Sequence, residues 1–132
     1  MYLLDTNTLI YALKGVPRVR TQLEKHRAES LAVSVVTLME LYYGAHKSQR
    51  KEANLARVRA IEEAFEVLPL GPECVETFGL LKAGLEQNGT PLDDFDLMLA
   101  AVALAHNLTL VSSNLRHFQR VKGLSLANWA MD

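Results

Sequence analysis

The sequence predicts an α/β fold, a three-layer α/β/α sandwich with a central, mostly parallel sheet. Short apolar runs alternate along the chain with longer helical patterns. No tight hairpin turn joins two of these runs, which favours parallel over antiparallel pairing. One run, LAVSVV at 31–36, is rich in the β-branched residues that are typical of a buried strand. Right-handed crossovers between such strands place helices on both faces of the sheet.

The first half of the chain supplies two of the expected strands. A short apolar run at 2–4 ends at Asp5, and a helix is expected at 6–14. Pro17 suits the first turn of a second helix, which extends to about Arg27. The buried strand at 31–36 follows, and helices are then expected at 37–46 and at about 51–65.

The second half begins with a short strand at 66–70, which Pro69 ends or confines to a sheet edge. A helix at 72–88 stops at the pair Asn88-Gly89. The remaining elements are a helix at about 93–106, a clear strand at 108–111 and a short strand near 124–126. We expect the whole chain, residues 1–132, to form a single domain.

Composition narrows the class of protein. Apolar residues make up 49% of the chain and charged residues 22%, as in ordinary globular proteins. The single cysteine, Cys74, excludes an internal disulfide and a multi-cysteine zinc site. The longest apolar run, 97–105, is too short to span a bilayer, and the first residues lack the features of a signal peptide, so we expect a cytoplasmic protein. A net charge of −1 excludes duplex binding by bulk charge, although basic residues occur in groups such as Arg57 and Arg59.

Polar residues collect where the expected strands end. Ligands of such sheets bind outside the carboxyl ends of the strands, so these positions are candidates for a site. They are Asp5, Thr6 and Asn7 after the first strand, Ser34 and Thr37 after the second with Glu40 one helical turn further on, and Ser112, Ser113 and Asn114 after the strand at 108–111. Asp93, Asp94 and Asp96 open the helix that precedes this last strand.

Taken singly, each acid has a structural explanation. Asp5 suits a helix cap, Glu40 a salt bridge, and acids such as Asp96 complement a helix dipole. However, Glu40 and Asp96 interrupt apolar segments, where an unpartnered carboxylate is expensive. Two carboxylates about 4 Å apart repel by about 4 kcal/mol at an effective dielectric of about 20, so a cluster needs a cation.

An oxygen-rich set of Asp, Glu, Asn and Ser suits a hard divalent ion, Mg²⁺ or Mn²⁺. Such an ion can activate water and stabilise the leaving oxygen of a phosphodiester. The histidines show no paired ligand spacing; they are His26, His46, His106 and His117.

Four segments, in this order and at these separations, resemble the PIN-domain toxins of the VapC type over nearly the full chain. The segments are LLDTNTLIY, SVVTLMELYYGA, GTPLDDFDLMLAAVALAHNLTLVSSNLRHFQRV and GLSLANW. The resemblance implies a PIN-like sandwich and a metal-dependent endoribonuclease, the toxin component of a type II toxin–antitoxin system. It also implies a homodimer, and a cognate VapB-type antitoxin whose C-terminal segment fills the groove and blocks the site.

Carried over by position, three acids look like the metal ligands: Asp5, Glu40 and Asp96. The fourth catalytic position falls at Asn114, where many relatives carry Asp, and this departure leaves the occupancy of a second metal site open. Residues that look like supports of the ligands are Asn7, Thr37 and Ser112, and Asp94 matches an acid of some relatives.

The expected mechanism is in-line attack of metal-activated water on phosphorus, which leaves 5′-phosphate and 3′-hydroxyl ends. The acid cluster motivates it, together with the lack of a histidine pair for metal-free acid–base cleavage. The candidate RNA substrates are tRNA, ribosomal RNA and messenger RNA.

The sequence leaves two other functions open. A catalytically weak PIN-fold module would bind RNA or a partner without cutting, and Asn114 is its support. A haloacid-dehalogenase-like phosphatase would use Asp5 as its nucleophile, but Asn7 stands where it needs a second Asp.

Aromatic residues are expected to pack rather than to stack on bases; they are Tyr42, Tyr43 and Trp129. Leu41, Tyr42 and Tyr43 cannot all face one core from one helix, which predicts apolar surface for a partner.

Overall fold

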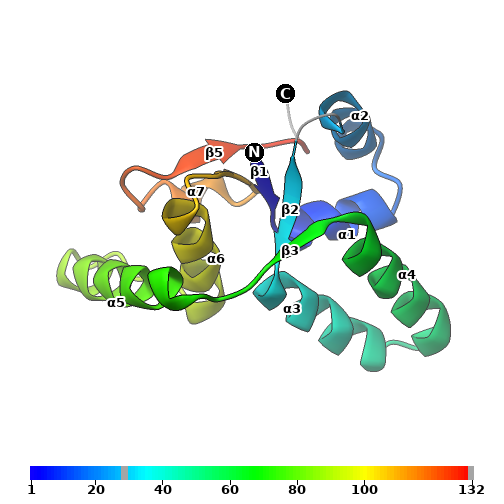
Figure 1. The fold of residues 1–132 in the computed structure, drawn as a ribbon, viewed down its shortest axis with the longest axis horizontal. Helices are drawn as coiled ribbons and strands as arrows, with labels where there is room; N and C mark the ends of the chain where they lie inside the picture. The colour runs from blue at the N-terminus through cyan, green and yellow to red at the C-terminus, as the bar shows by residue number, and fades with distance from the viewer. Residues whose placement is uncertain (28–29, 131–132) are drawn as a thin grey trace.

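Five parallel strands form the centre of the molecule (Figure 1). The computed structural model describes residues 1–27 and 30–130, and all statements below concern these residues. The strand order is β3-β2-β1-β4-β5, and every neighbouring pair is parallel. The strands are β1 (Tyr2–Leu4), β2 (Leu31–Ser34), β3 (Glu66–Leu68), β4 (Thr109–Val111) and β5 (Ser125–Ala127).

Helices cover both sides of the sheet, which confirms the expected α/β/α sandwich (Figure 1). On one side lie α1 (Thr6–Leu13), α2 (Pro17–His26), α3 (Val35–His46) and α4 (Lys51–Ala64). On the other side lie α5 (Pro72–Gln87), α6 (Asp94–Ala105) and α7 (Leu115–Phe118). Among the described residues, no helix combines the length and the apolar character needed to cross a membrane.

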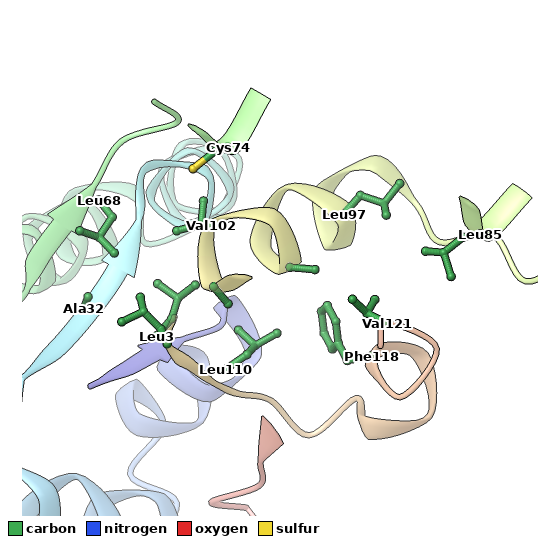
Figure 2. Close-up of a cluster of buried hydrophobic side chains, with 13 residues drawn as sticks. Leu3, Ala32, Leu68, Cys74, Leu85, Leu97, Val102, Leu110, Phe118 and Val121 are labelled. Atoms are coloured by element: carbon green, nitrogen blue, oxygen red, sulfur yellow. The ribbon is translucent and has the colours of Figure 1, made fainter. Parts of the chain in front are cut away.

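Each central strand sends successive side chains into two separate cores. Strand side chains alternate between faces, so a sheet covered on both sides needs continuous apolar strands. The six side chains concerned are fully buried: Leu3, Ala32 and Leu110 lie in the core beneath α5 and α6, and Leu4, Val33 and Val111 lie in the core beneath α3 and α4. Figure 2 shows the first of these cores, to which Leu97 and Val102 of α6 and Phe118 of α7 contribute.

The expected elements are all present, with boundaries that differ by two residues or fewer. One boundary error is physically informative, because Val35 and Val36 were expected in a strand and belong to α3. The hydroxyl of Ser34 accepts a hydrogen bond from the N–H of Val36 at 3.1 Å, and this cap starts the helix in spite of the β-branched residues. The short helix α7 was not expected.

The sheet reverses its strand order between β1 and β4. The chain proceeds from β1 through β2 to β3 in one direction, and the pair β4 and β5 extends the sheet in the other. The N–H of Asp5 donates to the carbonyl of Val111 at 3.1 Å, so the chain segments that leave β1 and β4 start side by side. Such a switch point at the carboxyl ends of parallel strands is the usual position of a binding crevice in open α/β sheets.

Candidate active site

Asp5 occupies the switch point and is 4% exposed. It caps α1, and its Oδ1 accepts a hydrogen bond from the N–H of Thr8 at 2.8 Å. The hydroxyl of Thr8 donates to the carbonyl of Val111 at 3.2 Å, which ties the start of α1 to the end of β4. The carboxylate is therefore held rigidly, with its second oxygen outside this cap.

Glu40 reaches the same region from α3 and is half-buried. The hydroxyl of Thr6 donates to its Oε1 at 2.6 Å and lies 3.4 Å from the hydroxyl oxygen of Thr37, which is fully buried. Thr6 directly follows Asp5, so this hydrogen bond brings the carboxylate of Glu40 beside the end of β1. Thr6 was not expected to contact a site acid, because its partner is 34 residues away in sequence.

Asp96 lies in the first turn of α6, the helix that packs against α3. Its N–H donates to Oδ1 of Asp93, the residue that caps the helix, at 2.9 Å. Burial, and after it the negative charge of Asp93, raise the pKa of Asp96 to about 6, although His117 acts in the opposite direction. Without a cation, this position therefore disfavours the charged carboxylate.

A chain of polar contacts connects the end of β4 with Asp96. The hydroxyl of Ser112, which is fully buried, accepts from the N–H of Asn114 at 2.9 Å. Nδ2 of Asn114 lies 2.7 Å from Nδ1 of His117, and that nitrogen lies 3.7 Å from Oδ2 of Asp96. From the sequence, His117 shows no paired ligand spacing with the other histidines. The signal that could have found this contact is its spacing of three residues from Asn114, the residue that caps α7.

Glu40 and Ile10 line two cavities. One has a volume of about 410 Å³ and is lined by Thr6, Asn7, Ile10, Met39, Glu40, Tyr43 and Phe95. Because Phe95 precedes Asp96, this cavity joins the α1 and α3 side of the site to the start of α6. The other has a volume of about 270 Å³ between α1, α3 and α4, with Lys14 and Arg57 among its lining residues.

Asp94 lies apart from this arrangement. Its Oδ1 is 3.0 Å from Nζ of Lys82 on α5, and its side chain is 55% exposed. This ion pair joins α6 to α5, which favours a structural role for Asp94 over direct participation in the site.

The acids of the switch point fit a bound cation. Among residues 1–27 and 30–130, no lysine, arginine or histidine forms an ion pair with Asp5 or Glu40. A carboxylate as buried as Asp5 is costly without a positive partner. Carboxylate, amide and hydroxyl oxygens are the ligands that Mg²⁺ and Mn²⁺ prefer.

The aromatic residues behave largely as expected. Trp129 is buried, and its ring stacks on that of His26 with 5.0 Å between centroids, which confirms its packing role. On α3, Leu41 is buried while Tyr43 is 66% exposed, so one helix does present apolar surface to the outside.

Comparison with known proteins agrees with this geometry. The PIN domain family matches residues 2–124. The tRNA(fMet)-specific endonuclease VapC of Salmonella typhimurium is 36% identical, and ribonuclease VapC2 of Haemophilus influenzae is 38% identical, with 97% of each chain covered in both cases. The crystal structure of VapBC2 from Rickettsia felis bound to a DNA fragment from their promoter superposes with a TM-score of 0.91. The two sequences are 35% identical, and the match covers 97% of this chain and 98% of that one.

PIN nucleases generally use divalent metal ions. This chain belongs to the PIN-domain family, among the VapC proteins.

Proposed function

We propose that the protein is a metal-dependent endoribonuclease and the toxin of a type II toxin–antitoxin pair, with Asp5, Glu40 and Asp96 as its metal ligands. The observation that carries the proposal is the set of acids at the switch point, where neither the buried Asp5 nor the Thr6-bound Glu40 forms an ion pair with a cationic side chain of the described part of the chain. The nuclease names of the VapC relatives support the reaction class.

The proposed ion is Mg²⁺ or Mn²⁺. When bound, such an ion lowers the pKa of a coordinated water and stabilises negative charge on phosphate oxygens. The donors are all oxygens, which favours these ions over softer metals. The raised pKa of Asp96 supports the same conclusion, because a cation is what would keep this carboxylate charged at neutral pH.

Neighbouring side chains and backbone groups orient the proposed metal ligands. Asp5 accepts a hydrogen bond from the N–H of Thr8, and Glu40 accepts one from the hydroxyl of Thr6, so both carboxylates are oriented by a neighbouring group. The contact between Asn114 and His117 uses the amide nitrogen, and the amide oxygen of Asn114 is the atom we propose for the fourth site position. Thr37, Ser112 and Asn7 are proposed to support these groups.

The smaller of the two cavities beside Glu40 is the proposed position of the substrate and the antitoxin. Lys14 and Arg57 bring positive charge to the 270 Å³ cavity, which suits phosphates of RNA approaching the acids. The same cavity has apolar lining residues such as Leu41 and Val58, which suit a side chain of a VapB-type antitoxin segment. Because one relative is named for tRNA(fMet), initiator tRNA is the first substrate to test.

The test uses purified, antitoxin-free protein incubated with initiator tRNA and with total RNA in Mn²⁺. We expect cleavage by the wild type, and no detectable cleavage by Asp5→Asn, Glu40→Gln or Asp96→Asn, or in excess EDTA. Asp94→Asn is the matched control, since it removes a carboxylate of the same helix that pairs with Lys82, and it should cleave as the wild type does. The products should carry 5′-phosphate ends.

Full activity of Asp5→Asn, with an unchanged circular dichroism spectrum, would falsify the mechanism. RNA binding without cleavage by the wild type in Mn²⁺ would instead identify a binding module.

A further inference from the structure

A second cluster of ligand-type side chains joins α5 to α6, away from the proposed catalytic acids. Glu73 and Cys74 lie in the first turn of α5, and His106 is the residue that ends α6. One oxygen, nitrogen and sulfur atom from these residues all lie within 4.8 Å of one another. His106 follows Asp96 by ten positions along α6 and its C-cap, which corresponds to about 15 Å along the helix axis. The cluster is therefore a separate feature of the fold.

The geometry points to a zinc-binding site at Glu73, Cys74 and His106, with water as a fourth ligand, that fastens the start of α5 to the end of α6. Thiolate, imidazole and carboxylate are the three ligand types of zinc, and three protein ligands with one water complete its tetrahedral coordination. The inference does not depend on the proposed nuclease activity.

The spacing of the ligand atoms is close to what zinc requires. Two oxygen or nitrogen ligands with bonds of about 2.0 Å to one tetrahedral ion lie about 3.3 Å apart. Oε1 of Glu73 and Nε2 of His106 are 3.3 Å apart. A sulfur and an oxygen ligand lie about 3.5 Å apart around the same ion, and Sγ of Cys74 is 4.0 Å from the same Oε1. Both pairs are therefore within about 0.5 Å of the spacing around a tetrahedral zinc ion, and Sγ of Cys74 lies within 4.8 Å of the ligand nitrogen of His106.

Gly71 makes room for the Glu73 carboxylate. A Cβ at position 71 would lie 2.6 Å from Oε1 of Glu73, so any other residue would force the carboxylate to shift from this position. Gly71 has a φ of −81°, which alanine adopts without strain. The substitution Gly71→Ala is thus a way to move the Glu73 ligand while leaving the backbone intact.

Exposure allows an ion to enter. The side chains of Glu73 and His106 are 48% and 31% exposed, while Cys74 is 1% exposed at the border of the core, where Figure 2 shows it beside Val102 of α6. On binding, the Cys74 thiol releases its proton to solvent and the sulfur takes the metal. A solvent-facing ion with one buried sulfur ligand would act as a cross-link between the two helices.

Co²⁺ is the spectroscopic probe, because Zn²⁺ has a filled d shell and gives no signal. The chain contains one cysteine, so a cobalt–thiolate charge-transfer band in the near ultraviolet reports on Cys74 alone, and carboxylates at the other site cannot produce it. We expect the reduced wild-type protein to develop this band on titration with Co²⁺, to lose it on addition of Zn²⁺, and to unfold at higher temperature with Zn²⁺ than with EDTA.

Substitutions distinguish a site with three protein ligands from metal binding by the Cys74 thiol alone. Cys74→Ser should abolish the band, and His106→Gln, Glu73→Gln and Gly71→Ala should each weaken cobalt binding by about tenfold or more. The control is His46→Gln, an exposed histidine at the end of α3, which should bind as the wild type does. RNA cleavage by His106→Gln should be unchanged. Absence of the band in the wild type, or a band of wild-type affinity in His106→Gln, would show that Glu73 and His106 form only an ion pair.

Discussion

The hydroxyl of Thr6 donates a hydrogen bond to Oε1 of Glu40 across 2.6 Å, and it is the contact that joins the first helix to the acid of α3. Thr6 follows Asp5 in the chain, so a single side chain sets the position of one proposed ligand relative to another. Groups that orient metal ligands in this way contribute to metal affinity without touching the metal.

Replacement of Thr6 by valine keeps its shape and removes the donor. We expect Thr6→Val to weaken Mn²⁺ binding by about tenfold to a hundredfold, with a matching loss of RNA cleavage at limiting Mn²⁺. Thr6→Ser retains the hydroxyl and should stay near wild type. Calorimetric titration of Mn²⁺ into the three proteins tests this, and equal affinities would show that the hydrogen bond does not position Glu40.

Asp96 should destabilise the metal-free protein at neutral pH. Its folded-state pKa of about 6 lies above the value of 3.8 for the free side chain. The stability associated with the neutral form is therefore complete below about pH 4 and is lost as the pH rises through about 6. Asp96→Asn should then have a higher Tm than the wild type at about pH 7 in EDTA, and the difference should shrink toward about pH 4.

Excess Mn²⁺ should reduce or reverse this difference, because the cation stabilises the ionised carboxylate of the wild type alone. A Tm difference that does not depend on pH would contradict the assignment of the raised pKa to Asp96.

Arg57 should contact the RNA backbone, since it lines the cavity that also contains Glu40. We expect Arg57→Ala to raise the KM for RNA several-fold and to reduce the salt dependence of binding, with a smaller effect on kcat. Arg59→Ala is the matched control, because Arg59 is an exposed residue of the same helix that lines neither cavity beside Glu40. Equal effects of the two substitutions would indicate that Arg57 promotes RNA binding only through the overall charge of the protein and not through a contact with the RNA backbone.

A second copy of the chain should cover the exposed apolar residues of α3 and α6. Met39, Tyr43 and Phe95 are 51%, 66% and 46% exposed, and all three line the larger cavity beside Glu40. The expected homodimer should dissociate at least about tenfold more readily in Tyr43→Arg, since buried tyrosines often dominate interfaces. Thr21→Arg, an exposed change on α2, controls for added charge. Sedimentation of the wild type as a monomer at all concentrations would contradict this prediction.

The sequence predicted the parts of the site that depend on strand ends. Asp5 directly follows one apolar run and Asn114 lies three residues after another, so the topology of a parallel sheet was sufficient to place them at one edge. The strand at 31–36 was predicted too long, because β propensity is a weaker local signal than the Ser34 cap that starts α3.

Contacts between distant side chains could not be predicted in this way. The bond between Thr6 and Glu40, and the approach of His117 to Asp96, depend on the packing of helices that adjoin different strands. The pairing of Glu73 with His106 likewise depends on the antiparallel packing of α5 and α6, which no local pattern specifies at the level of single atoms.

Anomalous diffraction from crystals of the antitoxin-free protein soaked in Mn²⁺ tests the central claim most directly. The account predicts a manganese peak within bonding distance, about 2.2 Å, of carboxylate oxygens of Asp5, Glu40 and Asp96. A peak that avoids these three residues, or its persistence in Asp5→Asn crystals at undiminished height, would contradict the account.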